Sequence, residues 1–214
     1  MGSELLQIVG VSLLVSGVAI AVSMLLGVPV GIFLGLHRFP GRRLAVTLVN
    51  TGMGLPPVVV GLVVFLLLAR AGPLGHLGLL YTPTAMILAH IVLAWPLVVG
   101  VTLAAIQGLD DRLRLQILSL GASRRQLYWT LVREARLSLV AALAAGFGSI
   151  ISEVGAVMMV GGNIRGETRV MTTAIVLETR QGNFRLAIAL SAVLLGMALA
   201  VNWLFTWVQQ RGRT

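Results

Sequence analysis

Long apolar stretches without polar alternation make up most of the chain, and five of them are long enough to cross a membrane. They cover residues 5–36, 44–69, 84–107, 137–160 and 184–208. A membrane-spanning helix needs about 20 consecutive apolar residues, whereas a barrel strand needs about 10 with alternating polarity. The pattern therefore predicts an all-α polytopic membrane protein in which residues 1–214 form one domain with five transmembrane helices.

The first apolar stretch exceeds the length of one span, so we expect its helix to tilt, to kink at Pro29 or to project beyond the membrane. Along it, Ser23, Gly27, Gly31 and Gly35 recur every four residues and share one smooth helix face. Small residues at this spacing let a second helix approach closely. We therefore assign this face to helix packing rather than to chemistry.

The second stretch contains "NTGMGLPPVVVG" at residues 50–61, in which two adjacent prolines stand among three glycines. Proline removes a backbone donor and clashes with the preceding turn, so we expect a bent or locally broken helix. Such a break either lines a transport path or is a plain kink, and both interpretations stay open. Residues 170–178, in the polar segment before the last span, are too short to cross a membrane and predict an interfacial or re-entrant helix.

Composition supports the bilayer as the solvent of this chain. Hydrophobic residues make up 57% and charged residues 11%, with a mean hydropathy of +0.97, whereas soluble proteins have about 25% charged residues. The net charge of +9 comes from arginines clustered between apolar stretches. That pattern is typical of loops beside an anionic membrane surface and speaks against a nucleic-acid partner.

The chain lacks lysine and cysteine, and both absences restrict the nucleotide and metal chemistry that it can carry out. All sixteen basic residues are arginine, so the chain lacks the lysine of a P-loop and any nucleotide-driven work needs another subunit. Cysteine is absent, and His37, His76 and His90 share no metal-ligand spacing. We predict no metal site and no cofactor in this chain, with ATP bound by a partner subunit. His90 is expected to be a hydrogen-bonded, buried imidazole rather than a ligand.

The arginine distribution predicts the orientation. With the N-terminus outside, the inner loops hold eleven arginines against five on the outer side, and positive residues favour the cytoplasm. The inner arginines are Arg38, Arg42, Arg43, Arg112, Arg114, Arg124, Arg125, Arg133, Arg136, Arg211 and Arg213. The start "MGSELL" lacks the basic region of a signal peptide, so we expect the first span to remain in the mature protein. The loop over residues 108–136 then lies in the cytoplasm.

Two short helices meeting at a tight turn are predicted within this cytoplasmic loop. The first helix has an apolar stripe formed by Leu113, Ile117 and Leu120. Gly121 suits the position after a helix C-terminus, and Ser123 with Gln126 has the spacing of a capping box, so the second helix begins at 124. This second helix has Leu127, Leu131 and Ala135 on one face. A plain alternative is an interfacial amphipathic segment whose arginines contact lipid headgroups.

The segment "LSLGASRRQLYWTLVREAR" resembles the cytoplasmic EAA loop of permease subunits of ATP-binding-cassette importers, which has the form E-A-A-x-x-x-G-A-S followed by an aromatic residue and L-P. The matching core is Gly121, Ala122 and Ser123, and Tyr128 or Trp129 matches the aromatic residue. The chain departs from the form at residues 115–117, which are Leu, Gln and Ile, and at Glu134, which replaces the proline.

This resemblance implies a type I importer permease fold with five spans and a coupling helix before Gly121. The helix would seat in a groove of the ATPase subunit. The residues it implies for ATPase coupling are Leu115, Leu118, Gly121, Ala122, Ser123 and Arg124. The implied partners are two ATPase subunits, a second copy of the chain, an external substrate-binding protein and membrane lipid.

The segment "SEVGAVMMVGGNIRGETRVMTTAI" (152–175) is similar to the tungstate and molybdate permeases, and "GGNI" followed by "RVMTTAIVLET" looks like the tungstate type. This resemblance implies a translocation path for an oxyanion, tungstate or molybdate. The alternatives are a permease for another small anion or solute, and an ion-coupled secondary carrier. A membrane enzyme is disfavoured because the spans contain no nucleophile–base pair and no paired carboxylates.

Candidate residues for the translocation path or gate are Glu153, Asn163, Arg165, Arg169, Thr172 and Thr173. A dianion needs hydrogen-bond donors and a positive potential, and the arginines and threonines, with Thr168, offer donors near the outer mouth. They could instead dock the binding protein or solvate a loop. A carboxylate within a span is costly unless paired, hydrogen-bonded or protonated, so we expect Glu153 to make a helix-packing hydrogen bond or a gating contact.

Overall fold

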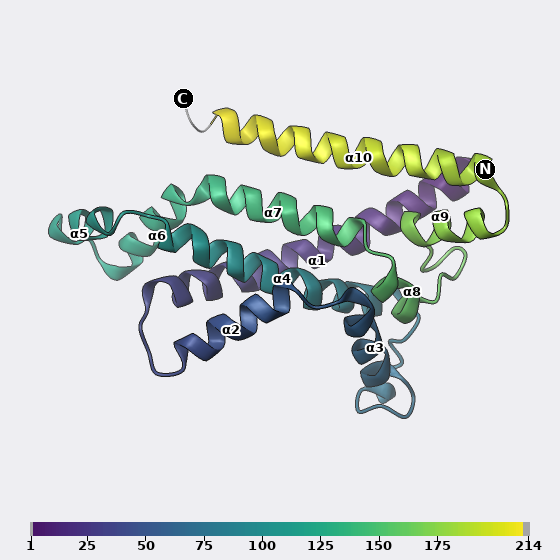
Figure 1. Ribbon diagram of the computed structural model, residues 1–214, viewed down its shortest axis with the longest axis horizontal. Helices are drawn as coiled ribbons and strands as arrows, with labels where there is room; N and C mark the ends of the chain where they lie inside the picture. Colours follow the sequence, from purple (N-terminus) through teal and green to yellow (C-terminus); the bar gives the residue numbers. More distant parts are fainter. Residues whose placement is uncertain (1, 212–214) are drawn as a thin grey trace.

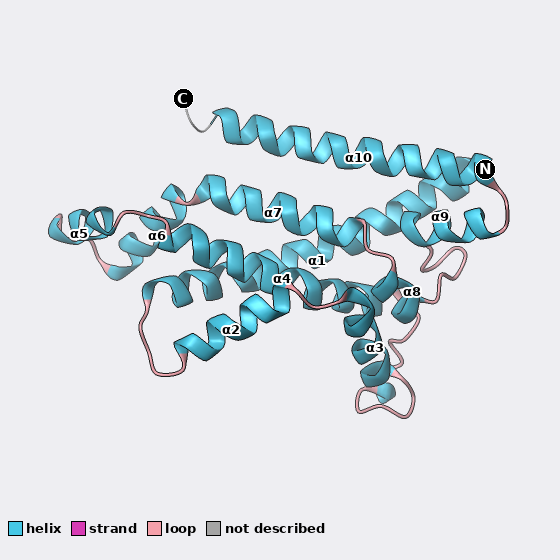
Figure 2. Cartoon of the chain, viewed as in Figure 1, coloured by secondary structure: helices cyan, strands magenta, loops and turns pink. Residues whose placement is uncertain are grey.

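The computed structural model describes residues 2–211, and this part of the chain is built from α-helices joined by loops, without a strand (Figures 1 and 2). The elements are α1 (Gly2–Leu36), α2 (Arg42–Met53), α3 (Pro57–Leu68), the 3₁₀ turn η1 (Gly75–Leu77), α4 (Pro83–Gln107), α5 (Asp111–Ser119), α6 (Arg124–Glu134), α7 (Arg136–Ile151), α8 (Gly155–Gly161), α9 (Met171–Arg180) and α10 (Phe184–Arg211). Arg213, counted above for the orientation, lies outside the described residues, as do the side chains of Arg114 and Arg211. The all-helical prediction is confirmed for residues 2–211.

Three helices, α1, α4 and α10, are individually long and apolar enough to cross a membrane. Two bent pairs raise the number of candidate spans to as many as five: α2 with α3, bent by 103°, and α6 with α7, bent by 62°. α1 stays helical through Pro29, and α4 stays helical through Pro96. The described residues therefore provide three to five candidate spans, and the first, third and fifth predicted stretches are single helices.

The packing of α1 against α4 confirms the predicted small-residue face. Ser23 is fully buried, and a Cβ added at Gly31 would lie 2.6 Å from the Cβ of Thr102. A Cβ at Gly27 or Gly35 would also meet side chains of α4 within 3.0 Å. The two helix backbones therefore approach each other along a seam that only small residues on α1 permit.

The second and fourth predicted stretches are both broken. The first break follows the proline pair: α2 ends at Met53, and α3 restarts with Pro57 at its first position. Between Ile151 and Gly155 the fourth stretch is also interrupted, so the span expected over 137–160 is not one continuous helix. That break lets α8 turn onto α3, where a Cβ at Gly61 would lie 2.6 Å from the Cα of Ala156.

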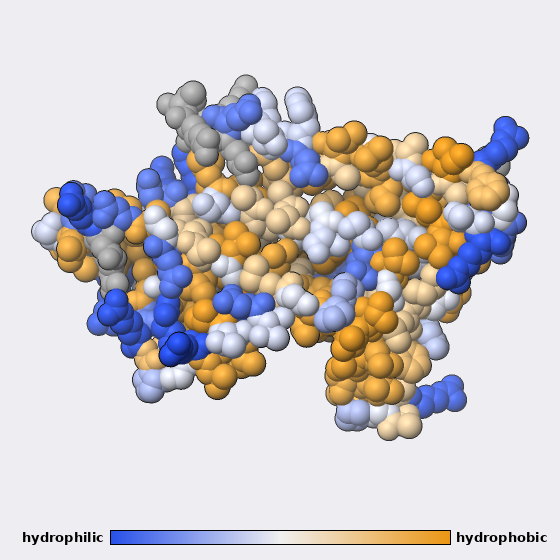
Figure 3. Space-filling model, viewed as in Figure 1, coloured by the Kyte–Doolittle hydropathy of each residue, from blue (hydrophilic) through white to orange (hydrophobic). Residues whose placement is uncertain are grey.

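Polar and apolar residues separate along the length of the molecule. α5 and α6 lie at one end, whereas the N-terminus, α9 and the loops beside it lie at the other (Figure 1). Hydrophilic side chains gather at both ends, with an apolar band between them that includes α3 and α10 (Figure 3). Large side chains of α10 such as Leu195, Leu199 and Trp203 are more than half exposed. An apolar surface of this extent is covered by lipid or by another protein chain.

Candidate functional site

The two helix breaks open onto one cavity of about 360 Å³. The α2–α3 break lines it with residues 52–57, the middle of α4 adds Leu93 and Leu97, and the α7–α8 break adds Ser149 and Glu153. Non-helical backbone at membrane depth is tolerated where it is buried in protein or lines a cavity. The interpretation that the proline break lines a path is therefore compatible with its position.

Glu153 holds the α7–α8 break together. Its Oε1 accepts a hydrogen bond from the Ala156 N–H at 3.1 Å, in the first turn of α8. Its backbone carbonyl accepts a hydrogen bond from Thr172 Oγ1 at 2.9 Å, which fastens α9 to the break. The carboxylate bond is local, to a backbone N–H three residues on, so a helix-packing or gating role of this side chain stays a prediction; Glu153 also lines the cavity.

The predicted threonines use their hydroxyl groups inside the fold. Thr173 Oγ1 donates to Asn163 Oδ1 at 2.9 Å and accepts from the Val170 N–H at 3.2 Å. Thr168 Oγ1 donates to the Gly161 carbonyl and accepts from the Ile164 N–H. These contacts fasten the 161–170 loop to α8 and α9. Anion contact or gating by Asn163, Thr172 and Thr173 stays a prediction, with the two threonine hydroxyls and the Asn163 Oδ1 already hydrogen-bonded in this structure.

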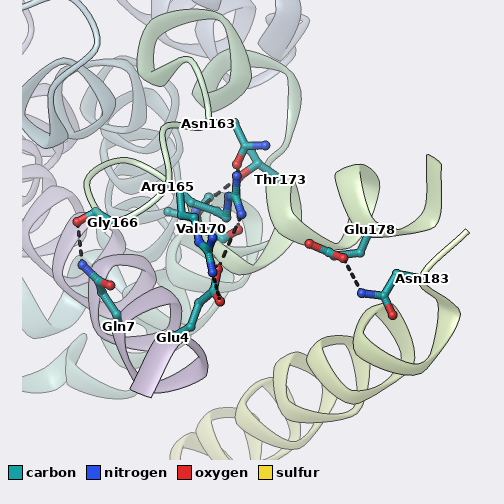
Figure 4. Close-up of polar contacts among 10 residues, drawn as sticks. Glu4, Gln7, Asn163, Arg165, Gly166, Val170, Thr173, Glu178 and Asn183 are labelled. Atoms are coloured by element: carbon teal, nitrogen blue, oxygen red, sulfur yellow. Dashed lines mark hydrogen bonds and ion pairs between the residues drawn. The ribbon is translucent and has the colours of Figure 1, made fainter. Parts of the chain in front are cut away.

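An ion-pair cluster closes the end of the molecule where the N-terminus lies (Figure 4). The Nε and Nη2 of Arg165 donate to the two carboxylate oxygens of Glu4 at 2.8 and 2.7 Å. Arg169 lies 3.7 Å from the same carboxylate, and Gln7 donates to the Gly166 carbonyl. The hydrogen bond to Glu4 raises the pKa of Arg165 above its usual value. Glu4 was not among the predicted residues, because its partners lie about 160 positions away and no local pattern links them.

The turn between α5 and α6 has the predicted geometry. Gly121 adopts a left-handed conformation with φ of 77° after the end of α5. Ser123 forms a reciprocal capping box: its N–H donates to Gln126 Oε1 at 2.7 Å, and its Oγ accepts from the Gln126 N–H at 3.4 Å. Leu127 and Leu131 are buried against the ends of α1 and α4. The predicted turn between two short helices, with its glycine and its capping box, is therefore confirmed at this end of the molecule.

The apolar side chains of α5 divide between the bundle and the outside. Leu113 and Ile117 pack against the bundle, but Leu120 is 87% exposed, so its predicted place in that stripe is wrong. α5 ends at Ser119, and the chain turns at Leu120 toward Gly121, which points that side chain away. Leu115 and Leu118 are exposed as well. These three leucines, defined here as the α5 leucine surface, are the large apolar side chains that α5 and its C-terminal residue expose.

His90 differs from its expected state. It is 3% exposed, and neither ring nitrogen has a hydrogen-bond partner within residues 2–211, so the prediction of a hydrogen-bonded imidazole is wrong. The seam between α1 and α4 also leaves the hydroxyls of Ser23 and Thr102 without partners in that part of the chain. Among the described residues, no group of three His, Cys, Asp or Glu side chains could hold a metal ion.

Comparison with known proteins places the chain among transport components. Residues 27–214 match the family model described as binding-protein-dependent transport system inner membrane component. A probable anion ABC transporter permease protein from Haloferax volcanii is 46% identical over 203 residues, covering 92% of this chain and 88% of that protein. The tungstate uptake system permease protein TupB of Peptoclostridium acidaminophilum is 41% identical over 199 residues, covering 93% of this chain and 87% of the relative.

A more distant relative is also named as a permease protein of a transport system. The molybdenum transport system permease protein ModB of Escherichia coli K12 is 28% identical and covers 92% of both chains. Among solved structures, the fold is similar to an inward-facing MetNI methionine ABC transporter, with a TM-score of 0.81 and 18% identity over 99% of this chain and 97% of that one. That likeness concerns the fold.

Proposed function

Because the chain belongs to the family of binding-protein-dependent transport system inner membrane components, we propose that it is the permease of an ATP-driven importer for an oxyanion, tungstate ahead of molybdate. It is a transport subunit and not an enzyme, and ATP is hydrolysed by a separate ATPase subunit. The cargo assignment rests on whole-length similarity to tungstate and anion permeases. One structural observation carries the transport role: two broken helices meet at a single cavity.

The proposed topology has five spans: α1, the broken pair α2–α3, α4, the broken pair α7–α8, and α10. The N-terminus is outside and the C-terminus is cytoplasmic. Two features support this arrangement: the arginine excess on the proposed inner side, and the placement of α5 and α6 at the end opposite the N-terminus (Figure 1). The inner membrane location follows from the family.

The proposed path passes the cavity at the two breaks. Glu153 contributes the carboxylate there, and a bound dianion would be repelled by it, so Glu153 serves as a gate contact rather than a ligand. Ser149 provides a hydroxyl group from α7. A cavity that offers few strong anion ligands suits a path, because transport requires the cargo to leave as readily as it enters.

Filling the cavity tests the path. Ser149→Phe places a bulky ring in the cavity, whereas Ala145→Phe adds the same ring one turn earlier on α7, where the side chain is exposed and does not line it. We expect Ser149→Phe to reduce ATP-dependent tungstate uptake into proteoliposomes strongly, because the ring would occupy the space through which the anion passes. The control should retain uptake. Equal uptake by both variants would remove the cavity from the path.

The α5 leucine surface is proposed to seat in the ATPase, with two ATPase subunits serving two copies of the chain. Leu115→Arg would place a charge in that apolar contact, and Leu77→Arg makes the same change at an exposed leucine of η1, distant from α5. We expect the ATPase to be lost on co-purification with the first variant and retained with the second. Retention by both would refute α5 as the coupling helix.

Substrate choice is tested with the external binding protein of the same system. Uptake of radiolabelled tungstate is measured in competition with molybdate and with sulfate. Tungstate uptake resistant to excess sulfate is the expected result. Uptake that sulfate abolishes would favour the alternative of a permease for another small anion, and ATP-independent uptake would favour a secondary carrier.

A further inference from the structure

A second cavity, of about 330 Å³, lies at the end of the molecule that carries α5 and α6. It is lined by residues of the end of α1, the loop to α2, the start of α2, the end of α4, the segment to α5 and α6. Figure 1 shows where these elements lie in the fold. Its lining is mainly polar and includes His37, Arg38, Arg42, Gln107 and Asp110. The proposed transport path does not use this cavity.

Two guanidinium groups at this cavity, those of Arg38 and Arg42, have no carboxylate partner among the described side chains, which do not include that of Asp111. Arg42 donates one hydrogen bond, from Nε to the Leu34 carbonyl at 2.8 Å, which leaves its two terminal nitrogens available. Asp110 is the acid in the lining, and its Oδ1 accepts from the Arg112 N–H at 2.9 Å to cap α5. Two arginines against one carboxylate give the described lining of the cavity a net positive formal charge.

The helix ends at the cavity would normally add negative partial charge, because carbonyl groups there lack intrahelical partners. Several of them are already hydrogen-bonded here. Phe33 O accepts from the His37 N–H, Leu34 O from Arg42, and Ala104 O from the Gly108 N–H. The carbonyls that would repel an anion are therefore partly neutralised, and the arginines dominate.

His37 forms a fixed wall of the cavity. Its Nδ1 lies 3.1 Å from the Phe33 carbonyl, and its Nε2 lies 3.1 Å from the Tyr128 hydroxyl. A carbonyl only accepts hydrogen bonds, so Nδ1 carries a proton, and Nε2 and the Tyr128 hydroxyl share the second hydrogen bond. The ring thereby joins the end of α1 to α6 and holds the loop that carries Arg38 and leads to Arg42 at the start of α2.

We propose that this cavity binds a tetrahedral oxyanion group: the phosphate of an anionic lipid headgroup or a free inorganic oxyanion. Arginine suits this chemistry because its planar fork matches phosphate oxygens bidentately. The position favours a headgroup, since α4 is a membrane-length helix and the cavity lies at its end. The volume lies near the lower limit of about 300–1,000 Å³ for ligand pockets, enough for a headgroup.

Arg38 gives the sharpest variant, because no other described group depends on it for a hydrogen bond, whereas Arg42 also caps α1. Arg38→Gln removes one cavity charge. Arg43→Gln is the matched control: the same change at an exposed neighbour on the same side, outside the cavity lining. Helix content by circular dichroism verifies that both variants fold. Arg38→Lys keeps the positive charge but loses the planar guanidinium group that binds two phosphate oxygens at once.

Retention of dioleoylphosphatidylglycerol by the purified permease is measured by native mass spectrometry, with dioleoylphosphatidylcholine as the zwitterionic comparison. Binding of inorganic phosphate and of tungstate is measured separately by calorimetry. We expect Arg38→Gln to weaken phosphatidylglycerol retention by roughly tenfold, as for loss of one charged hydrogen-bonding group, and Arg38→Lys to lie between. Arg43→Gln should match the parent protein.

The lipid-retention measurement and the calorimetry distinguish the two sources of the oxyanion. Loss of phosphatidylglycerol alone assigns the cavity to a lipid headgroup, and loss of phosphate or tungstate binding alone assigns it to a free anion. Three results would overturn the proposal. The parent protein could bind neither phosphatidylglycerol nor a free oxyanion, it could retain phosphatidylglycerol and phosphatidylcholine equally, or Arg43→Gln could lose as much binding as Arg38→Gln. These outcomes do not depend on the proposed transport function, since no binding protein, ATPase or uptake enters the measurement.

Discussion

Replacing Gly31 by alanine would force α1 and α4 apart at one of their closest contacts. The added Cβ would lie 2.6 Å from the Cβ of Thr102 and 2.8 Å from the carbonyl oxygen of Val99, whereas ordinary contacts lie at 3.4–4 Å. The Val99 oxygen belongs to the backbone of α4 and cannot rotate away. Relief therefore requires the helices to separate, which also disturbs the neighbouring contacts of the seam.

The magnitude follows from a matched pair on one helix. Gly17 has nothing within 4 Å of the position that an added Cβ would take, so Gly17→Ala adds a side chain in open space. Both substitutions gain the same helix preference, about 1 kcal/mol for alanine over glycine. Overpacking adds a cost of about 1–3 kcal/mol to Gly31→Ala alone. The difference between the variants thus isolates the packing cost of the seam.

Reversible unfolding of the purified permease in mixed detergent–SDS micelles, followed by circular dichroism, measures both free energies of unfolding. We expect Gly31→Ala to be less stable than Gly17→Ala by about 1–3 kcal/mol, with Gly17→Ala equal to or slightly more stable than the parent. Equal stability of the two variants would refute the close approach of α1 and α4. A loss confined to Gly17→Ala would refute it equally.

Three other substitutions probe the sites. Gly121→Ala puts a Cβ into open space but at φ of 77°, and this left-handed backbone costs a non-glycine residue about 1–2 kcal/mol. Titration with the ATPase should therefore show binding about 5–30-fold weaker, and unchanged affinity would contradict a rigid corner. Glu4→Gln weakens the ion pair with Arg165 and should speed tryptic cleavage at that residue. The parent protein at high salt should also be cleaved faster, because salt screens the exposed pair. Equal cleavage rates in the variant, the parent and the parent at high salt would contradict a stabilising ion pair. Glu153→Ala removes the side chain that accepts from the Ala156 N–H at the start of α8, and should lower the free energy of unfolding by about 0.5–2 kcal/mol. Glu153→Gln keeps the acceptor oxygen and should not lower it. Equal losses in both variants would show that this hydrogen bond does not stabilise the fold.

Local sequence signals were sufficient where a structure depends on neighbouring residues. The capping box at Ser123 and the turn at Gly121 are determined within a few positions, and both occur where the sequence predicts them. The four-residue spacing from Ser23 to Gly35 likewise identifies a packing face. It does not identify the partner, because any helix with suitable side chains could occupy that face.

The remaining features depend on contacts between distant segments. No proline marks the break at residues 152–154, which follows from packing α8 onto α3 at Gly61 and from the hydrogen bond between Glu153 and the first turn of α8. The partnership of Glu4 with Arg165 and the contact of His37 with Tyr128 join residues about 160 and 90 positions apart. Composition indicated charged ends, and only the fold shows which charges meet.

The connection between the corner and the central cavity gives the proposed coupling a physical route. Ala135, which is 3% exposed, is the single residue between α6 and α7. α7 has 16 residues, or about 24 Å at 1.5 Å per residue, and its far end carries Ser149 at the cavity, just before the break at Glu153. Because a buried joint with no intervening loop leaves little room for slack, a rotation of the α5–α6 corner, caused by an ATPase bound to α5, would be passed along α7 to the break. There the contact of Gly61 with α8 links the second broken helix to the first, so displacement of one break would move the other.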